Sequence, residues 1–304
     1  MEVVLIVNPF ASGVSEARVE AVERELQRVA DVRRRVTERP RHGAELAAEV
    51  LPGQALVVFS GDGGFNEVLN GVSDGVQVGF LPGGGTSVLS RALGLPRDPV
   101  DAARQVAKAL ETGRERRISL GRVNGRRFGF SAGIGLDAEL VRRVDALGRR
   151  DDGKRPGDAA YLLAAARLAG RRRGRFEPAL EVRGLGRAAF ALVANTDPYT
   201  YAGRVSVHVA PKARFELGLD LVAPERAGPT DLPRLLGYAL RGQGLESAGD
   251  VLYGHDLDRI DVRCDRPLPL QADGEDLGDV ETAAFEAERD AVSILAPDAG
   301  TLTA

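Results

Sequence analysis

The first hundred residues repeat one pattern: a short apolar run, a turn, and then a stretch with the spacing of an amphipathic helix. Continuous apolar runs stand at residues 3–7 and 55–59, and further strands are indicated at 32–37 and 76–81. Unbroken apolar strands of this length are typical of a sheet that is buried on both faces. Because strands and helices alternate, the pattern predicts a doubly wound parallel α/β sheet with helices on both sides.

From residue 116 onward the predicted strands come closer together. Asn124 and Gly125 lie between two apolar stretches, which is a strong signal for a β-hairpin. Helical stretches are expected at 137–147 and 158–171, and short strands follow, with separate ones at 260–264 and 268–272. The second half is therefore predicted to be an antiparallel β-sandwich with helical insertions.

These two patterns place a domain boundary near residue 120. We predict an α/β domain over residues 1–119 and a β-rich domain over 120–290. A last strand is expected at 291–295, and the sequence leaves open whether the final segment, 291–304, returns to the first domain. A chain of 304 residues is long enough for two domains of this size, each with its own core.

Composition argues against several classes of protein. The net charge of −3 gives no basic field, so no nucleic-acid partner is expected. The single cysteine, Cys264, excludes an internal disulfide and a cysteine-rich zinc site. No apolar run approaches the roughly 20 residues that span a bilayer, and the first residues predict a strand rather than a signal peptide. We therefore expect a cytoplasmic protein.

Three glycine-rich turns follow strands of the predicted sheet, at residues 8–13, 60–67 and 81–87. Glycine lets the backbone approach an anion closely, and a helix that starts after such a turn offers unpaired N–H groups. A single turn of this kind is more often an ordinary connection. Three of them at the carboxyl ends of parallel strands meet at one edge of the sheet and favour a polyphosphate site. The candidate residues are Asn8, Pro9, Ser12, Gly13, Ser60, Gly61, Gly63, Gly64, Asn66, Glu67, Gly84, Gly85 and Thr86.

Asp62 is a carboxylate within the second turn. It would repel a phosphate directly, so its functional interpretation is to hold Mg²⁺ through water against a nucleotide. The alternative is that Asp62 caps a helix N-terminus. The turn is neither a Walker A loop nor a dinucleotide fingerprint, since both spacings are absent.

Two carboxylates flank a glycine in the second domain, as Asp273-Gly274-Glu275. A carboxylate near a bound nucleotide can accept a proton from a hydroxyl that attacks the terminal phosphate. The alternative is a surface turn, because Asp-Gly is a common turn pair.

The segment that begins at Arg142 and ends at Arg175 is rich in arginine and contains an apolar helical stretch. Such a segment can engage anionic lipid headgroups, which would make the protein a peripheral membrane protein. A solvated helix face explains the same composition equally well. The sequence leaves the oligomeric state open, a homodimer included.

Together these motifs resemble the diacylglycerol kinase catalytic family, in its bacterial soluble lipid-kinase branch. The family motif Gly-Gly-Asp-Gly-Thr-x-Asn-Glu-Val stands here as Ser-Gly-Asp-Gly-Gly-Phe-Asn-Glu-Val over residues 60–68. The turns at 8–13 and 82–86 and the Asp-Gly-Glu at 273–275 match in order, and Thr37 falls where the family often has a nucleotide-contacting threonine.

The resemblance implies a nucleotide-binding α/β domain, a lipid-accepting β-rich domain, and ATP with Mg²⁺ as cofactors. The substrate would be a lipid hydroxyl, that of diacylglycerol or a related lipid. Asp273 or Glu275 would be the base that accepts its proton, and Asp62 would organise the metal; the sequence does not choose between the first two.

Departures from the family pattern include Gly64, Ser87, Ser119 and Leu217. The last lies between Arg214 and Asp220, where the family often holds a structural Mg²⁺, so Leu217 argues against that site here. A catalytically weak nucleotide- or lipid-binding homologue is therefore an alternative. A kinase for a soluble substrate, such as NAD, is a weaker one.

Overall fold

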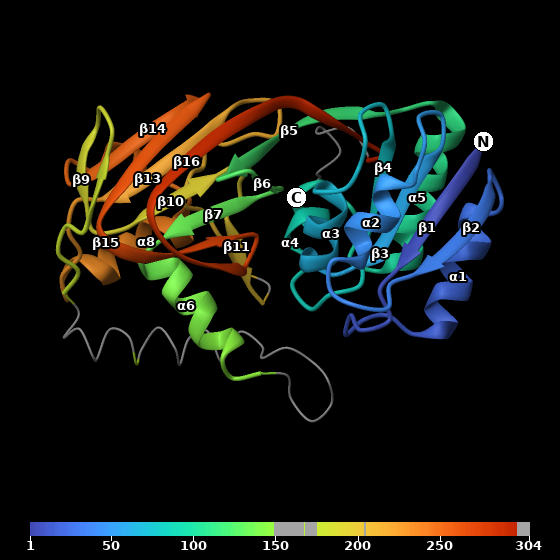
Figure 1. Ribbon diagram of the computed structural model, residues 1–304, viewed down its shortest axis with the longest axis horizontal. Helices are drawn as coiled ribbons and strands as arrows, with labels where there is room; N and C mark the ends of the chain where they lie inside the picture. Colours follow the sequence, from blue (N-terminus) through green and yellow to red (C-terminus); the bar gives the residue numbers. More distant parts are fainter. Residues whose placement is uncertain (149–166, 168–174, 204, 297–304) are drawn as a thin grey trace. The chain divides into compact units, whose positions relative to one another are not determined.

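The computed structural model describes residues 1–148, 167, 175–203 and 205–296. It divides into two compact units (Figure 1). The first contains Met1–Ile118 and the end of the chain from Asp290, and the second is Ser119–Arg289. The division therefore falls one residue before the boundary that the sequence patterns suggest.

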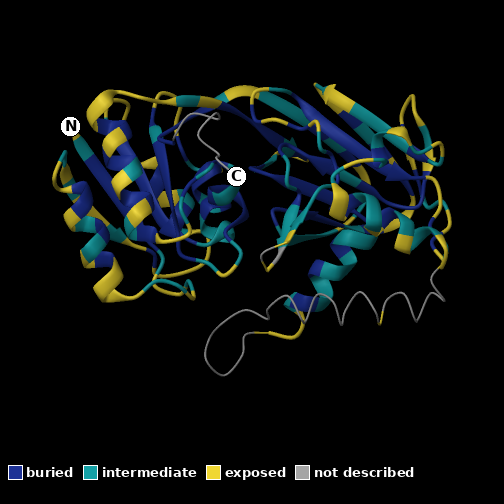
Figure 2. Cartoon of the chain, turned by 180° about the vertical axis from the view of Figure 1, so that it is seen from behind, coloured by how far each residue is buried: buried dark blue, intermediate teal, exposed yellow. Residues whose placement is uncertain are grey.

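The first unit is built on a parallel sheet. Its strands are β1 (Glu2–Val7), β2 (Asp31–Val36), β3 (Ala55–Ser60) and β4 (Gln77–Pro82), in the order β4–β3–β1–β2. The last residues of the long strand β16 (Glu275–Ile294) pair in parallel with β4, with Ser293 opposite Gln77. Every residue of β3 is buried, which requires a helical layer on each face (Figure 2).

Five helices supply those layers: α1 (Glu16–Leu26), α2 (His42–Ala48), α3 (Asp62–Leu69), α4 (Val88–Ala92) and α5 (Pro99–Thr112). Helices α1 and α5 pack against each other, as do α2 and α3, and both pairs contact the strands (Figure 1). Helix α5 has clear local signals, because the Asp98 side chain accepts from the N–H groups of Val100 and Asp101, and Gly113 ends it with φ 65°. The predicted doubly wound α/β unit is confirmed.

The second unit is antiparallel. Its main path runs β14 (Val251–Leu257), β13 (Leu219–Pro224), β10 (Ala191–Ala194), β7 (Ser131–Ile134), β15 (Arg259–Ala272) and β16, with short strands β8 (Leu180–Val182) and β9 (Gly186–Ala188) beside β15. A separate pair is β11 (Thr200–Ala202) and β12 (Val205–Val207). The inserted helices are α6 (Leu136–Asp145) and α8 (Asp231–Arg241), with a 3₁₀ turn at Leu245–Ser247. The predicted antiparallel β architecture with helical insertions is confirmed.

The hairpin predicted at Asn124-Gly125 is also confirmed. Strand β5 (Arg116–Val123) pairs with β6 (Arg126–Phe128), and Val123 lies opposite Arg126. Asn124 and Gly125 have φ values of 47° and 88°, and two positive φ angles in succession are what a tight two-residue hairpin requires.

One pair of predicted strands was wrong in extent. The two strands expected at 260–264 and 268–272 are one strand, β15, with a register shift against β16 between Arg263 and Leu268. The strand expected at 291–295 is confirmed as the end of the 20-residue β16, and its pairing with β4 returns the chain to the first unit. The helix predicted over 158–171 lies outside the described residues, Arg167 apart.

Helix α8 was not predicted, because it contains Pro233 and Gly237. Proline is tolerated here because it stands in the first helical turn, where backbone N–H groups have no partner within the helix. Helix α8 buries Leu235 and Ala239 against the core of the second unit. Among the described residues, no helix combines the length and the apolar character needed to cross a membrane.

Candidate functional site

The three glycine-rich turns of the first unit contact one another directly. The backbone N–H of Gly13 donates to the carbonyl of Gly83 at 2.7 Å, and the N–H of Gly83 donates to the carbonyl of Ser60 at 2.6 Å. The side-chain amide of Asn8 donates to Ser60 Oγ at 3.1 Å. These bonds join the turns after β1, β3 and β4, so their predicted convergence is confirmed.

The glycines of these turns fall into two groups. A Cβ built on Gly84 would lie 2.9 Å from the Gly61 Cα, and one built on Gly13 would lie 2.9 Å from the Gly83 carbonyl oxygen. These glycines are needed for turn-to-turn packing. At Gly63 and Gly85, by contrast, no described atom lies within 4 Å of an added Cβ. The backbone at these two positions is open to a ligand.

Asp62 caps a helix other than its own. Its Oδ2 accepts from the N–H of Val88 at 3.0 Å, and its Oδ1 accepts from the N–H of Leu89 at 3.1 Å. Both donors belong to the first turn of α4, whereas the N-cap position of α3 is Gly61. Asp62 therefore caps a helix, as the alternative interpretation proposed. The capped helix is α4, not α3, which Asp62 itself begins.

Three other predicted site residues in the first unit have contacts within the fold. Glu67 accepts from the N–H of Arg41 at 2.9 Å and of Gly43 at 3.0 Å, and so holds the start of α2. Asn66 is 1% exposed and accepts from the Asn70 side chain. Thr37 is buried after β2, and its N–H donates to the carbonyl of Val7 at 2.9 Å.

The remaining predicted residues of the turns lie nearer solvent. Pro9, Ser12 and Gly85 are exposed, and Gly64 and Thr86 are half-buried. Ser87, one of the departures from the family pattern, is buried with φ 49°, and its Oγ donates to the Gly84 carbonyl at 3.2 Å. It thus tightens the third turn.

The two carboxylates of the second unit have different environments. Asp273 is 6% exposed, and its carboxylate accepts from the N–H groups of Gly129, Phe130 and Ser131 at 2.6, 3.0 and 3.2 Å. It therefore clamps the connection between β6 and β7. A proton placed on this carboxylate would disrupt that set of bonds.

Glu275 is accessible. Its side chain is 40% exposed and forms an ion pair with Arg126. The sequence did not choose between Asp273 and Glu275, and the structure shows that Asp273 is buried whereas Glu275 is accessible to solvent.

A buried network that the sequence analysis missed lies next to this turn. Tyr199 donates its hydroxyl to Asp137 Oδ2 at 2.7 Å, and Gln271 Nε2 donates to the same oxygen at 2.5 Å. Gln271 Oε1 accepts from the N–H of Gly274 at 2.9 Å, which connects the network to the acidic turn. Burial raises the pKa of the Asp137 carboxyl, and the two hydrogen bonds oppose that rise. No spacing in the sequence joins residues that are 134 positions apart.

Ser119, where the family often has aspartate, lies in a buried polar cluster of the second unit. Asn195 Nδ2 donates to the carbonyls of Ser119 and Gly129, both at 2.8 Å. Ser119 Oγ and Asn195 Oδ1 have no hydrogen-bond partner within the described residues. A buried serine hydroxyl supplies no negative charge here, so the family's aspartate has no substitute at this position.

The segment between Arg214 and Asp220 does not fit a structural Mg²⁺. The Leu217 side chain offers no ligand, and Asp220 is fully buried between Tyr253 and His255, whose Nδ1 lies 2.8 Å from its Oδ1. Nearby, the Arg289 guanidinium donates to Asp256 and Asp258, at 2.9 and 2.7 Å. Within the described residues, no three acidic, histidine or cysteine side chains gather closely enough to hold a metal ion.

Only the ends of the predicted lipid-contact segment are described. Arg142 forms ion pairs with Asp276 and Asp279, at 2.7 and 2.6 Å, and Arg143 donates to Glu139. Residues 149–166 and 168–174 lie outside the described part of the chain. The first two arginines are therefore neutralised within the second unit.

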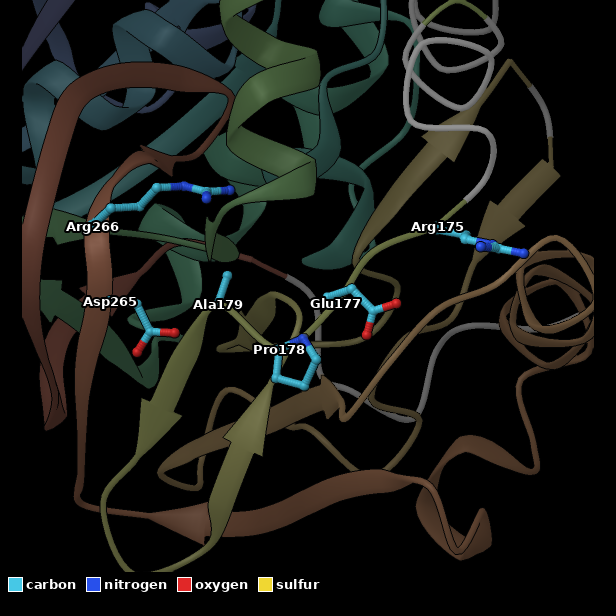
Figure 3. Close-up of a pocket in the computed structure, with 6 residues that line it drawn as sticks. All are labelled: Arg175, Glu177, Pro178, Ala179, Asp265 and Arg266. Carbon is cyan, nitrogen blue, oxygen red and sulfur yellow. The ribbon is translucent and has the colours of Figure 1, made fainter.

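A surface pocket of the second unit contains no residue of the glycine-rich turns or the acidic turn, but it includes Arg175, the last residue of the predicted lipid-contact segment (Figure 3). It is lined by Arg175, Glu177, Pro178, Ala179, Asp265 and Arg266. The charged side chains of this pocket are of both signs, and none of its lining residues is a glycine. We therefore do not assign it to the candidate phosphate site.

The fold is shared with solved diacylglycerol kinase structures. The crystal structure of a diacylglycerol kinase from Bacillus anthracis str. Sterne aligns with a TM-score of 0.72 and 17% identity, over 98% of this chain and 97% of that chain. A second structure from the same strain gives a TM-score of 0.77 and 21% identity, over 98% and 96%. At these identities, the likeness establishes the two-unit fold class.

The first part of the sequence is similar to a known catalytic domain. Residues 2–123 match the model of the diacylglycerol kinase catalytic domain. A Bacillus subtilis (strain 168) protein named diacylglycerol kinase is 29% identical over 225 residues, which are 72% of this chain and 70% of the relative. The resemblance predicted from the turn motifs is thus confirmed.

Proposed function

We propose that the protein is an ATP- and Mg²⁺-dependent lipid kinase that phosphorylates the hydroxyl of diacylglycerol or a related lipid. The observation that carries the proposal is the chain of bonds from Gly13 to Gly83 to Ser60, which joins the three glycine-rich turns at the carboxyl ends of their strands. The family and the name of the Bacillus subtilis relative support a lipid as the acceptor.

The first unit supplies the phosphate donor site in this proposal. Gly63 and Gly85 are open to a ligand, and Gly63 lies in the first turn of α3, where backbone N–H groups have no partner within the helix. Asp62 would hold the metal through water, since its two oxygens already accept from α4. When bound, Mg²⁺ would neutralise the charge of the terminal phosphates.

The second unit supplies the base. As the lipid oxygen bonds to the γ-phosphorus and the bond to the leaving ADP oxygen breaks, Glu275 accepts the hydroxyl proton. Asp273 acts as a positioning residue, because its three backbone bonds hold the turn that carries Glu275. The arginine-rich segment from residue 142 to 175 would draw the enzyme to an anionic membrane, where its substrate lies.

A phosphoryl-transfer assay tests the proposal. The protein is mixed with radiolabelled ATP, Mg²⁺ and detergent micelles that contain diacylglycerol, and labelled lipid is the expected product. ATP binding without transfer to any lipid would mean a nucleotide-binding homologue rather than a kinase. Transfer to NAD without lipid or detergent would overturn the acceptor class.

Membrane association is tested separately. Vesicles that contain anionic lipid should sediment the protein at low salt and release it at high salt, because screening weakens surface attraction. Equal sedimentation with neutral vesicles would contradict the role proposed for the arginine-rich segment.

A further inference from the structure

The nucleotide motif of this chain differs from the family motif at two positions that are four residues apart. The family motif has glycine first and threonine fifth, whereas this chain has Ser60 first and Gly64 fifth. Taken together, the two differences move a hydroxyl-bearing side chain from the first turn of α3 to the end of β3.

The two positions share one space. A Cβ built on Gly64 would lie 2.1 Å from Ser60 Oγ and 2.8 Å from Ser60 Cβ. Rotation of the serine hydroxyl would relieve the first contact but not the second, because the Cβ stays in place. The space therefore holds one side chain, which comes from position 60 in this chain.

The Ser60 hydroxyl joins two of the turns. Ser60 is 1% exposed, and its Oγ accepts from Asn8 Nδ2 at 3.1 Å. The same nitrogen lies 3.5 Å from the Cβ position at Gly64, so a hydroxyl carried by residue 64 would reach it too. Because the Ser60 carbonyl accepts from Gly83, this one residue connects all three turns.

We propose that Ser60 is a positioning residue of the phosphate-donor site and that its hydroxyl replaces the threonine hydroxyl of the family motif. The proposal rests on the function proposed above. In this proposal, the hydroxyl lost at Gly64 is supplied by Ser60. The departure at this position then does not weaken the donor site.

A four-protein cycle tests the exchange: the natural chain, Ser60→Gly, Gly64→Thr, and the double variant. Mg·ATP affinity is measured by titration calorimetry and stability by the thermal unfolding midpoint. Ser60→Gly should weaken ATP binding about three- to tenfold, since a buried hydrogen bond is lost. Gly64→Thr should weaken binding and lower the midpoint, because two side chains compete for one space. The double variant should return close to the natural chain in both measurements.

Gly63→Ala is the matched control for stability, compared with Gly64→Ala. Both replace a glycine in the first turn of α3, but no described atom lies near an added Cβ at Gly63. Gly64→Ala should lower the midpoint, Gly63→Ala should not, and Ser60→Gly should rescue Gly64→Ala.

Additive losses in the double variant would overturn the exchange, as would unchanged ATP affinity in Ser60→Gly. If the natural chain binds no nucleotide, the proposed function fails and, with it, the role of Ser60 at a donor site. Whether positions 60 and 64 share one space is then decided by the unfolding midpoints alone. A midpoint of the double variant that returns to the natural value supports the shared space, and additive losses of the midpoint overturn it.

Discussion

The acidic turn of the second unit and the glycine turns of the first hold their shape by different means. In the first unit, backbone groups bond to backbone groups across turns, as Gly13 does to Gly83. In the second unit, the Asp273 side chain binds three backbone N–H groups of one connection. The glycine-rich turns and the acidic turn thus each contain buried residues that hold the backbone in place and accessible residues that a ligand can reach. Burial distinguishes these two groups of residues.

The largest expected effect is a loss of kinase activity on changing Glu275, the accessible carboxylate of the acidic turn. Glu275→Gln should lower the rate of lipid phosphorylation about 10²- to 10⁴-fold, the usual contribution of a general base. The unfolding midpoint should not change, because the side chain is 40% exposed. Glu281→Gln, which changes an exposed glutamate of the same strand, is the control and should keep full activity. Equal rates in the two variants would remove Glu275 from the mechanism.

Asp273→Asn should act through stability. An amide cannot accept from all three N–H groups, so unfolding should become easier by about 2–4 kcal/mol, the cost of leaving buried donors unpaired. Thermal unfolding followed by circular dichroism measures this loss. An unchanged midpoint together with lost activity would reverse the roles assigned to Asp273 and Glu275.

The two classes of glycine can be compared within one turn. Gly84→Ala should destabilise by about 1–3 kcal/mol, because the new methyl group would press on the Gly61 backbone. Gly85→Ala should leave stability nearly unchanged. It should weaken ATP binding, because the new methyl group would occupy space that the proposed nucleotide approaches. Equal midpoints for the two variants would contradict the distinction between packing and open glycines.

The pH dependence of stability tests the buried network around Asp137. Because burial raises its pKa above the ordinary value of 3.8, the folded state binds more protons than the unfolded chain between the two values. The Asp137 carboxyl therefore lowers the stability of the protein as the pH rises from its unfolded-state pKa to its folded-state pKa. Asp137→Asn should remove that contribution, so the variant should gain stability relative to the natural chain as the pH rises above 4. A constant difference across this range would contradict a raised pKa.

The smallest expected effect is that of metal removal on folding. Since the segment around Leu217 does not fit Mg²⁺, EDTA should leave the unfolding midpoint of the nucleotide-free protein unchanged. A drop that added Mg²⁺ reverses would reveal a structural metal.

Local backbone preference explains which elements could be predicted. The hairpin at Asn124-Gly125 and the turns after β1, β3 and β4 depend on neighbouring residues, and their signals were correct. Helix α8 and most of β16 run against local propensity and exist because packing and pairing outweigh it. The helix expected over 158–171 stays a prediction.

By itself, the sequence determined the order of strands and turns in the first unit, the antiparallel character of the second and the resemblance to the diacylglycerol kinase catalytic domain. Only the tertiary structure decided which residues of each motif are buried. Asp62 caps α4, Glu67 holds α2 and Asp273 clamps the start of β7, whereas Glu275 stays accessible. The physical reason is that a side chain's chemistry depends on the donors around it, and those donors come from parts of the chain that lie 24 to 144 residues away.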